Sequence, residues 1–427
     1  MAKQTFFPGW KVVAGSGIGI AFGSAPVFAS GFALLAAVMA HQFGWNQPQV
    51  AKAATIYLLV QTLVYPLCGW PLDRWGSRRF AILSILGFAV GLAVLSQVDG
   101  SLVQFYIAFA LIGLLSAGTN VVSYARAITL WFNRKRGIAL GLAASGQAIG
   151  AFLVPVLAQR GIAHYGWPTA LLILAVFEAI VCAPLVALLV KDDPARYGLQ
   201  PDGDANPAQP IVATANDTGP GVGAIVRTVT FWKLAIAFAV MGMSFYAIGP
   251  NIVYILKTAG ISLAVLAKIL AASGISVLFG RIGFGTLLDR IHAPLVGVCS
   301  LILFAISSLI YAGTPSVTLV LVSAVCYGLS IGGETDLMPY LASRYFGTHA
   351  VSKIFGWFLF AFFLGATVGP VAFAQLMATF GGAKTPLIML VALQIVPAAL
   401  FLSLGRYPAS PADRLQVVPS PVAKRTV

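Results

Sequence analysis

The stretch from Gly69 to Arg79 reads GWPLDRWGSRR, and it separates two long apolar runs. Part of it returns from Gly285 to Arg290 as GTLLDR, again directly after an apolar run. Both copies contain the pattern Gly-x-x-x-Asp-Arg. A charged turn repeated at the ends of equivalent apolar runs predicts a duplicated membrane bundle, the construction by which many secondary transporters form one site between two halves.

The composition is that of a membrane protein. Of the 427 residues, 59% are hydrophobic and only 9% are charged, whereas soluble domains carry about 25% charged residues. The apolar runs reach roughly 20 residues, the length that a helix needs to cross the hydrocarbon layer. They are continuous, unlike the short alternating strands of a membrane barrel. We therefore expect an all-α membrane protein.

The net charge of +14 follows the expected topology. Basic residues gather in the segments after every second apolar run, for example Arg134, Lys135 and Arg136. Such segments face the cytoplasm by the positive-inside rule, so the lipid bilayer explains the charge and no nucleic-acid partner is expected. The rule predicts a multi-pass protein of the cell (inner or plasma) membrane with both termini in the cytoplasm.

Twelve transmembrane helices account for the apolar runs. They are expected at residues 10–41, 48–72, 79–98, 101–131, 137–162, 167–190, 231–258, 261–288, 293–312, 316–343, 351–379 and 384–405. Residues 191–230 are rich in Pro, Gly, Asp and Ala, which is typical of a linker without its own core. The expected domains are a six-helix bundle over 1–190, a cytoplasmic linker over 191–230, a second six-helix bundle over 231–405 and a cytoplasmic tail over 406–427.

The sequence carries no signature of an enzyme. Its four cysteines stand singly in or beside apolar runs, without the spacing of a metal site. It lacks the Gly-x-x-x-x-Gly-Lys-Ser/Thr loop that holds nucleotide phosphates, so we do not expect an ATP-driven pump. We predict no catalytic residue, no metal and no cofactor.

The twelve spans, the central linker and the loop Gly69–Arg79 resemble the major facilitator superfamily. The loop fits the superfamily's Gly-x-x-x-Asp-Arg-x-Gly-x-Arg-Arg pattern. In the second copy His292 stands in place of the second glycine, and the basic end is missing. The resemblance covers essentially the whole chain. It implies two pseudo-symmetric six-helix bundles and transport by alternating access.

A narrower resemblance is to monocarboxylate transporters and the related oxalate/formate-type antiporters. The stretch Trp131–Gly146 reads WFNRKRGIALGLAASG, which looks like that family's aromatic and basic signature followed by a Gly/Ala-rich helix. Arg281 falls where the family has the arginine that pairs with the substrate carboxylate. Two groups that the family links to proton coupling are replaced here by Val27 and Val277, so the resemblance leaves the coupling ion open.

Charged side chains inside spans are candidates for function, because a charge in the hydrocarbon layer is costly. The planar fork of Arg281 suits two carboxylate oxygens, so we predict that it anchors the substrate carboxylate. The alternative is a permanent ion pair with Glu334, which lies at a similar depth. Glu334 or Asp336 is expected to carry the proton, with Glu334 facing the cavity and Asp336 contacting a neighbouring helix or loop. Glu178 is either a buried structural group or a second proton site.

Polar residues recur along single faces of two spans. Ser116, Asn120 and Tyr124 are spaced at i, i+4 and i+8, and a second set lies on roughly one side of span 231–258. These faces line a central cavity if the superfamily arrangement holds, and hydrogen bonds between helices are the alternative. The residues predicted to bind substrate are Arg281, Asn120, Tyr124, Asn251, Tyr254 and Tyr327.

The repeated loop is predicted to form the cytoplasmic gate. Asp73, with Arg74, Arg78 and Arg79, is expected to hold the gate closed through charge pairs that break on opening. Gly137, Gly141, Gly146 and Gly150 recur along the span that follows Arg136, and such spacing lets helix backbones approach closely.

The main hypothesis is a secondary active transporter of small monocarboxylates, such as lactate or pyruvate, that moves protons in symport and functions as a monomer. Two alternatives remain open. One is an exchange of carboxylates of the oxalate/formate type, and the other is proton-coupled efflux of amphipathic solutes.

Overall fold

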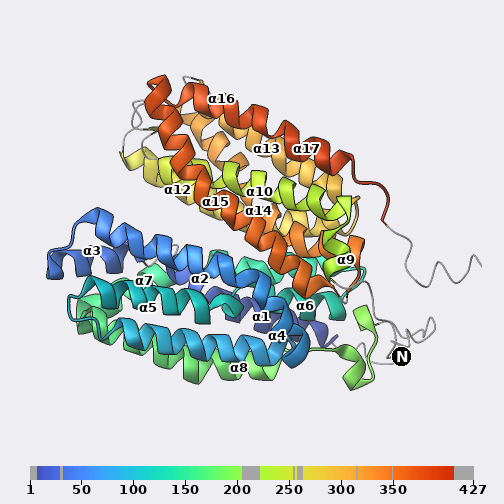
Figure 1. Ribbon diagram of the computed structural model, residues 1–427, viewed down its shortest axis with the longest axis horizontal. Helices are drawn as coiled ribbons and strands as arrows, with labels where there is room; N and C mark the ends of the chain where they lie inside the picture. The colour runs from blue at the N-terminus through green and yellow to red at the C-terminus, as the bar shows by residue number, and fades with distance from the viewer. Residues whose placement is uncertain are drawn as a thin grey trace, which may run out of the picture.

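The expectation of an all-α protein is confirmed by a computed structural model, which describes residues 7–28, 32–203, 222–252, 255–256, 263–313, 316–348 and 350–407. The described residues form helices, turns and loops, without strands. The chain makes two helical bodies (Figure 1), which we call the first half, up to Gly203, and the second half, from Val222. Tyr254, residues 204–221 of the expected linker and residues 408–427 of the expected tail lie outside the described residues.

The first half begins with two spans that are interrupted near their middle. One consists of α1 (Gly9–Ala21), α2 (Ser24–Pro26) and α3 (Phe32–Phe43). The other consists of α5 (Leu102–Leu115), a short 3-10 turn, η2 (Ala117–Thr119), and α6 (Val121–Trp131). Gly23 allows the two interruptions to touch, because a Cβ on it would lie 2.7 Å from the carbonyl oxygen of Thr119. The continuous spans expected over 10–41 and 101–131 are thus wrong in this detail.

The remaining spans of the first half lie in two very long helical segments. The first is α4 (Gln47–Leu95), and the second runs through α7 (Arg136–Phe177), the π-helical turn η3 (Glu178–Cys182) and α8 (Ala183–Leu189). Each segment contains one glycine with positive φ, Gly76 at 83° and Gly166 at 75°. Glycine adopts this conformation without a Cβ clash, so each segment divides there into two of the expected spans.

The second half is more regular. Its helices are α9 (Val222–Val226), α10 (Val229–Ile248) with the turn η6 (Gly249–Asn251), α12 (Leu263–Leu288), α13 (Ala293–Ala312), α14 (Val317–Phe346), α15 (Val351–Phe380), α16 (Lys384–Leu393) and α17 (Ile395–Leu402). Among the described residues, eight continuous helical stretches are long and apolar enough to cross a membrane. Two of the eight divide at a glycine into two spans each, which gives ten. The two interrupted spans of the first half bring the total to the twelve crossings expected from the sequence.

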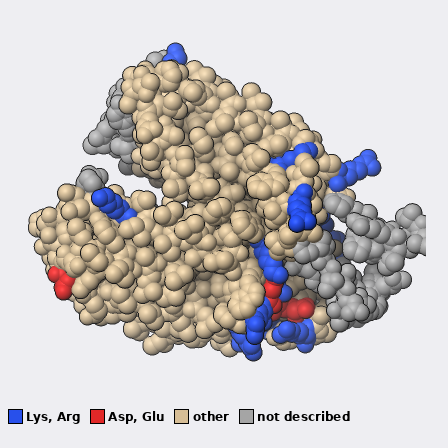
Figure 2. Space-filling view, in the orientation of Figure 1, with Lys and Arg blue, Asp and Glu red and all other residues tan. Residues whose placement is uncertain are grey.

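The two halves meet at one end of the molecule and diverge at the other (Figure 1). The space-filling view shows the surface hollowed between them at the left, and Lys and Arg gathered at the right (Figure 2). We call these the open end and the closed end. The closed end carries both copies of the repeated loop, so the repeated motif lies where the halves touch.

Glycines allow the halves to approach at two helix crossings. Where α7 crosses α12, a Cβ on Gly285 would lie 2.6 Å from the carbonyl oxygen of Gly137. Where α4 crosses α15, a Cβ on Gly69 would lie 2.6 Å from the Cα of Lys353. Both distances are below van der Waals contact, so no larger residue fits at these positions unless the helices separate.

We predict that Gly285→Ala destabilises the closed end, whereas Gly283→Ala in the same helix does not. A Cβ on Gly283 meets no heavy atom within 4 Å, so alanine there gains helix propensity of about 0.5–1 kcal/mol. The clash at Gly285 costs about 1–3 kcal/mol if the helices stay in place. Thermal unfolding of the purified variants in one detergent checks this: a lower midpoint is expected for Gly285→Ala alone, and equal midpoints would contradict it.

Candidate functional site

The centre of the candidate site is Arg281, on α12 of the second half. Its side chain is only 3% exposed, and it lies seven residues before the end of α12, about 10 Å along the helix axis. One guanidinium nitrogen, Nη2, donates a hydrogen bond of 2.9 Å to Oε1 of Gln147, on α7 of the first half. The other two nitrogens, Nε and Nη1, have no hydrogen-bond partner in the described part of the chain. Arg281 therefore has donors left for a further acceptor.

Two buried carboxylates on α14 lie within electrostatic range of Arg281, namely Glu334 and Asp336. Glu334 is 2% exposed and Asp336 is fully buried. Oε2 of Glu334 and both carboxyl oxygens of Asp336 lack a hydrogen-bond partner in the described chain. The site thus holds one cation and two carboxyl groups away from water. If both carboxyl groups are ionised, the three groups carry one net negative charge, and uptake of one proton by either acid removes the cost of burying that charge.

The ion pair considered between Arg281 and Glu334 is not formed. Among the described residues, no carboxylate oxygen of either acid lies within 4.0 Å of the Arg281 nitrogens. Asp336 lies close to a helix of the other half, since a Cβ on Gly141 of α7 would lie 3.5 Å from Oδ2 of Asp336. Residue spacing along α14 could not reveal this, because the contact depends on how the halves pack.

A cluster of polar side chains lies where the two interrupted spans of the first half meet. At its centre, Oγ of Ser24 accepts a hydrogen bond of 3.1 Å from Tyr57 and lies 3.5 Å from the donor nitrogen of Asn120. The Asn120 amide also lies 3.4 Å from the hydroxyl of Tyr65. Tyr65 stacks on Phe363 of the second half, with 5.5 Å between ring centroids. Asn120 is therefore linked to the interface between the halves.

The other residues predicted to line a cavity take different places. The stripe of Ser116, Asn120 and Tyr124 is broken, since η2 interrupts the helix between them, and Tyr124 is fully buried. Asn251 donates to the carbonyl oxygens of its own helix and of Pro370, on α15. Tyr327 donates to the carbonyl oxygen of Phe245 at 2.7 Å. For Asn251 and Tyr327, the alternative of hydrogen bonds to helix backbone is the one observed in this conformation.

Glu178 lies inside the first half rather than beside Arg281. It begins the π-helical turn η3, is 1% exposed, and is close enough to Tyr124 to interact electrostatically with it. One of its oxygens, Oε1, has no hydrogen-bond partner among the described residues. Glu178 is therefore a buried carboxyl group within one half.

The first copy of the repeated loop forms an ion pair between the halves. Oδ2 of Asp73 lies 3.0 Å from Nζ of Lys353, at the start of α15, and Oδ1 lies 3.7 Å from Nε of Arg126. The expectation that Asp73 pairs with Arg74, Arg78 and Arg79 is not met within the described residues. Arg74 instead lies over the ring of Trp70, 5.4 Å from its centroid. Sequence adjacency suggested the wrong partners, because the nearest cations in space come from other helices.

The second copy makes an equivalent contact by different means. The carboxylate of Asp289 accepts hydrogen bonds from the backbone N–H groups of Gly137 at 2.6 Å and Ile138 at 3.0 Å. Both N–H groups belong to the first turn of α7, where the helix dipole favours a negative charge. Burial raises the pKa of Asp289 above its ordinary value, and the two N–H donors act against this shift. The aspartate of the first copy thus forms an ion pair with a lysine, and the aspartate of the second accepts hydrogen bonds from a helix terminus.

Residues of the expected linker also contact the basic loops of the closed end. Oδ1 of Asp192 accepts from the backbone N–H of Arg78 at 2.9 Å. Oδ2 of Asp202 accepts from the N–H groups of Asn133 at 2.9 Å and Arg134 at 2.7 Å. The first part of this segment is therefore hydrogen-bonded to the first half through two carboxylates.

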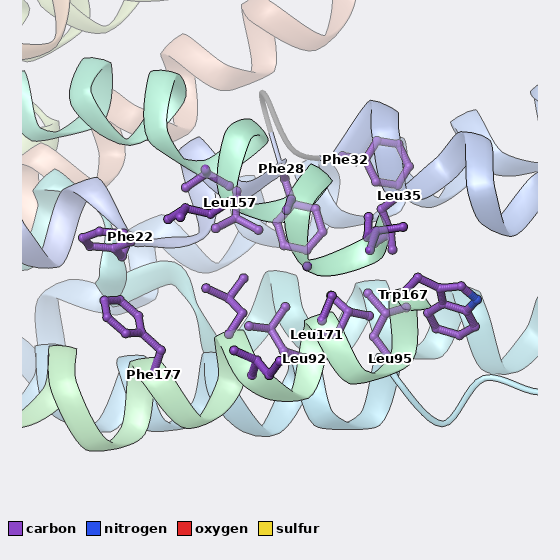
Figure 3. Close-up of a pocket in the computed structure, with 18 residues that line it drawn as sticks. Phe22, Phe28, Phe32, Leu35, Leu92, Leu95, Leu157, Trp167, Leu171 and Phe177 are labelled. Carbon is purple, nitrogen blue, oxygen red and sulfur yellow. The ribbon is translucent and has the colours of Figure 1, made fainter. Parts of the chain in front are cut away.

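An apolar cavity lies within the first half, separate from Arg281 (Figure 3). Its volume is about 340 Å³, and its lining comes from α3, α4, α7 and the residues that directly follow α1 and α2. Phe22, Phe28, Leu92 and Phe177 point into it in the close-up view. No charged side chain lines it, so it is unsuited to a carboxylate.

Gln147, Tyr65 and Gln61 were not predicted from the sequence; Gln61 donates a 3.3 Å hydrogen bond to Oγ of Ser24. Gln147 carried a usable signal, since it interrupts a stretch of small and apolar residues within a span, and polar groups are rare there. Its partner could not be inferred, because Arg281 lies 134 positions away along the chain.

Comparison with known proteins agrees with this architecture. A family model described as Major Facilitator Superfamily matches residues 16–370. Monocarboxylate transporter 4 of Mus musculus is 25% identical over 405 residues, 93% of this chain and 83% of the relative. Monocarboxylate transporter 12 of Rattus norvegicus is 26% identical over 366 residues, 79% of this chain and 74% of the relative. The crystal structure of the human organic anion transporter MFSD10 superposes with a TM-score of 0.68 at 15% identity, covering 92% of this chain and 99% of that one.

We predict that Asp289→Ala opens the closed end, whereas Asp289→Asn, which resembles the protonated acid, does not. Alanine removes both acceptors at the start of α7, a loss of about 0.5–2 kcal/mol, whereas asparagine keeps one. Spin labels on the exposed residues Lys135 and Arg406, one in each half, report the separation after the four native cysteines are replaced.

The same labels measure how the population of the open conformation depends on pH. A carboxyl group whose pKa is higher in the closed conformation than in an open one favours the closed conformation when protonated. The population with separated labels should therefore fall as pH is lowered from 7 through the carboxyl range in the wild type, and this component should vanish in Asp289→Asn. An unchanged pH response in that variant would exclude Asp289 as its source.

Proposed function

Since this chain belongs to the Major Facilitator Superfamily, a family of multi-pass membrane transporters, we propose that it carries small monocarboxylates across the cell membrane by alternating access, coupled to protons. The transport class follows from the family and from the transporter relatives. The substrate class, the coupling and the roles of individual residues are our proposal.

One observation carries the proposal. Arg281 is a buried guanidinium within a membrane-spanning helix, and its Nε and Nη1 have no hydrogen-bond partner in the described chain. Leaving charged donors unsatisfied is costly. A carboxylate offers two oxygens in the geometry of the guanidinium fork, so it is the ligand that best satisfies this group. Asn120 and Tyr65, on the other side of the interface, offer polar contacts for the remainder of a small acid.

The names of the relatives support the same substrate class. Two are called monocarboxylate transporters, and one solved structure is called an organic anion transporter. Lactate and pyruvate are the proposed substrates because both are small monocarboxylates. The proposed binding residues are Arg281, Asn120, Tyr124, Asn251, Tyr254 and Tyr327.

We further propose that the closed end faces the cytoplasm. The clustering of Lys and Arg at that end agrees with the positive-inside rule. The described conformation is then open to the outside, with the gate formed by Asp73 on one side and Asp289 on the other. The proposed domains remain 1–190, 191–230, 231–405 and 406–427, with both termini in the cytoplasm.

Proton coupling is assigned to the carboxyl groups beside Arg281. Either Glu334 or Asp336 can neutralise the guanidinium electrostatically while the substrate is absent. A bound substrate carboxylate supplies that negative charge itself, so the acid then carries a proton to avoid an excess of negative charge. Glu178, inside the first half, is the other proposed proton site.

We predict that Arg281→Gln abolishes accumulation of labelled lactate or pyruvate in proteoliposomes with an inward proton gradient. The loss of charge-assisted hydrogen bonds worth about 1.5–3 kcal/mol weakens carboxylate binding roughly 10- to 100-fold. Arg160→Gln, at an exposed position of α7, is the matched control and should transport like the wild type. Transport that tolerates Arg281→Gln would favour efflux of amphipathic solutes, the alternative function.

We predict that neutralising the proton carrier separates exchange from net uptake. Glu334→Gln and Asp336→Asn mimic the protonated acids, so the variant of the true carrier should exchange external for internal acid but should not accumulate acid on a proton gradient. Uptake with and without preloaded acid checks this. If wild-type protein itself exchanges acids but never accumulates them, the carboxylate antiporter becomes the function.

A further inference from the structure

We propose that Gln147 couples carboxylate binding to the contact between the halves. Its side-chain oxygen accepts a hydrogen bond from Arg281 when the site is empty, and the substrate carboxylate displaces it. This inference rests on the proposed function of Arg281 as the substrate anchor, and it adds a positioning residue to that site.

The contact joins the halves at the level of the site. Gln147 lies on α7 of the first half and Arg281 on α12 of the second, and the 2.9 Å hydrogen bond between them crosses the interface. The glycine crossing explains why they meet, because a Cβ on Gly141 would collide with the carbonyl oxygen of Arg281. Gln147 is half-buried whereas Arg281 is 3% exposed. Gln147 is therefore the more accessible of the two groups.

The chemistry of the pair favours its replacement. The amide oxygen of Gln147 is a neutral acceptor that engages one of the guanidinium donors, while Nε and Nη1 stay unsatisfied. A carboxylate forms charge-assisted, bidentate hydrogen bonds with a guanidinium, and each is roughly twice as strong as a hydrogen bond to a neutral acceptor. The substrate therefore outcompetes the amide, and the amide partly satisfies the arginine when no substrate is present.

Two consequences follow for transport. Breaking the amide contact opposes substrate binding, so removing the amide should tighten binding. Without the amide, the buried cation is less well satisfied in the occluded state through which the empty protein reorients, so reorientation without substrate becomes slower. A glutamate at the same place would compete with the substrate as a permanent internal carboxylate.

The test uses the full-length purified protein and three substitutions at one position. Binding of labelled lactate, pyruvate and oxalate is measured in detergent, and net uptake and exchange are measured in proteoliposomes. Gln147→Met keeps the side-chain length without the amide, Gln147→Glu adds the charge, and Gln147→Asn retains a shorter amide. Gln159→Met is the control, since Gln159 is exposed on the same helix.

For Gln147→Met we expect binding about 3- to 10-fold tighter than in the wild type, with net uptake slowed and exchange retained. For Gln147→Glu we expect binding more than about 10-fold weaker, and Gln147→Asn should restore part of the net uptake lost in Gln147→Met. A merely structural glutamine would change exchange and net uptake together and would not tighten binding.

The outcomes separate the two proposals. If an acid binds the wild type in a manner that needs Arg281, yet Gln147→Met leaves its affinity and the ratio of exchange to net uptake unchanged, the role of Gln147 is refuted and the transport function stands. If none of the acids binds folded wild-type protein, the proposed function fails and the role of Gln147 fails with it.

Discussion

The crossing of α7 and α12 at Gly137, Gly141 and Gly285 is the constraint on which the rest of the site depends. Only glycines at these positions let two helices from different halves approach backbone to backbone. The approach places Asp289 on the free N–H groups of α7 and Arg281 against Gln147. The contacts of Asp289 and Arg281 therefore share one pair of helices, so a change at either residue alters the same interface.

The crossing of α4 and α15 repeats this arrangement around the pseudo-symmetry of the fold. Gly69 lets the backbone of Lys353 approach, and Asp73 pairs with the lysine ammonium. An aspartate from each half thus contacts the start of a helix in the other half, once through an ion pair and once through backbone N–H groups. For the second aspartate, a helix terminus takes the place of the lysine as the positive partner.

The candidate site could be predicted in part. Arg281, Glu334 and Asp336 were identifiable because charges inside apolar spans are costly and rare, and the structure places all three within electrostatic range. Their partners were not identifiable. Asp73 forms ion pairs with Lys353 and Arg126 instead of with its own loop, and the polar stripe of span 101–131 is interrupted by η2. Periodicity assumes an unbroken helix, and it does not record which faces of distant helices meet.

The sequence by itself determined the membrane environment, the number of crossings and the duplication, since these follow from the length of apolar runs and from a repeated charged turn. It also supplied the intramembrane charges. Only the tertiary structure decided which groups meet: Asp73 with Lys353, Asp289 with the start of α7, and Arg281 with Gln147. The physical reason is that these contacts join residues more than a hundred positions apart, and the packing of the two halves brings them within hydrogen-bond distance.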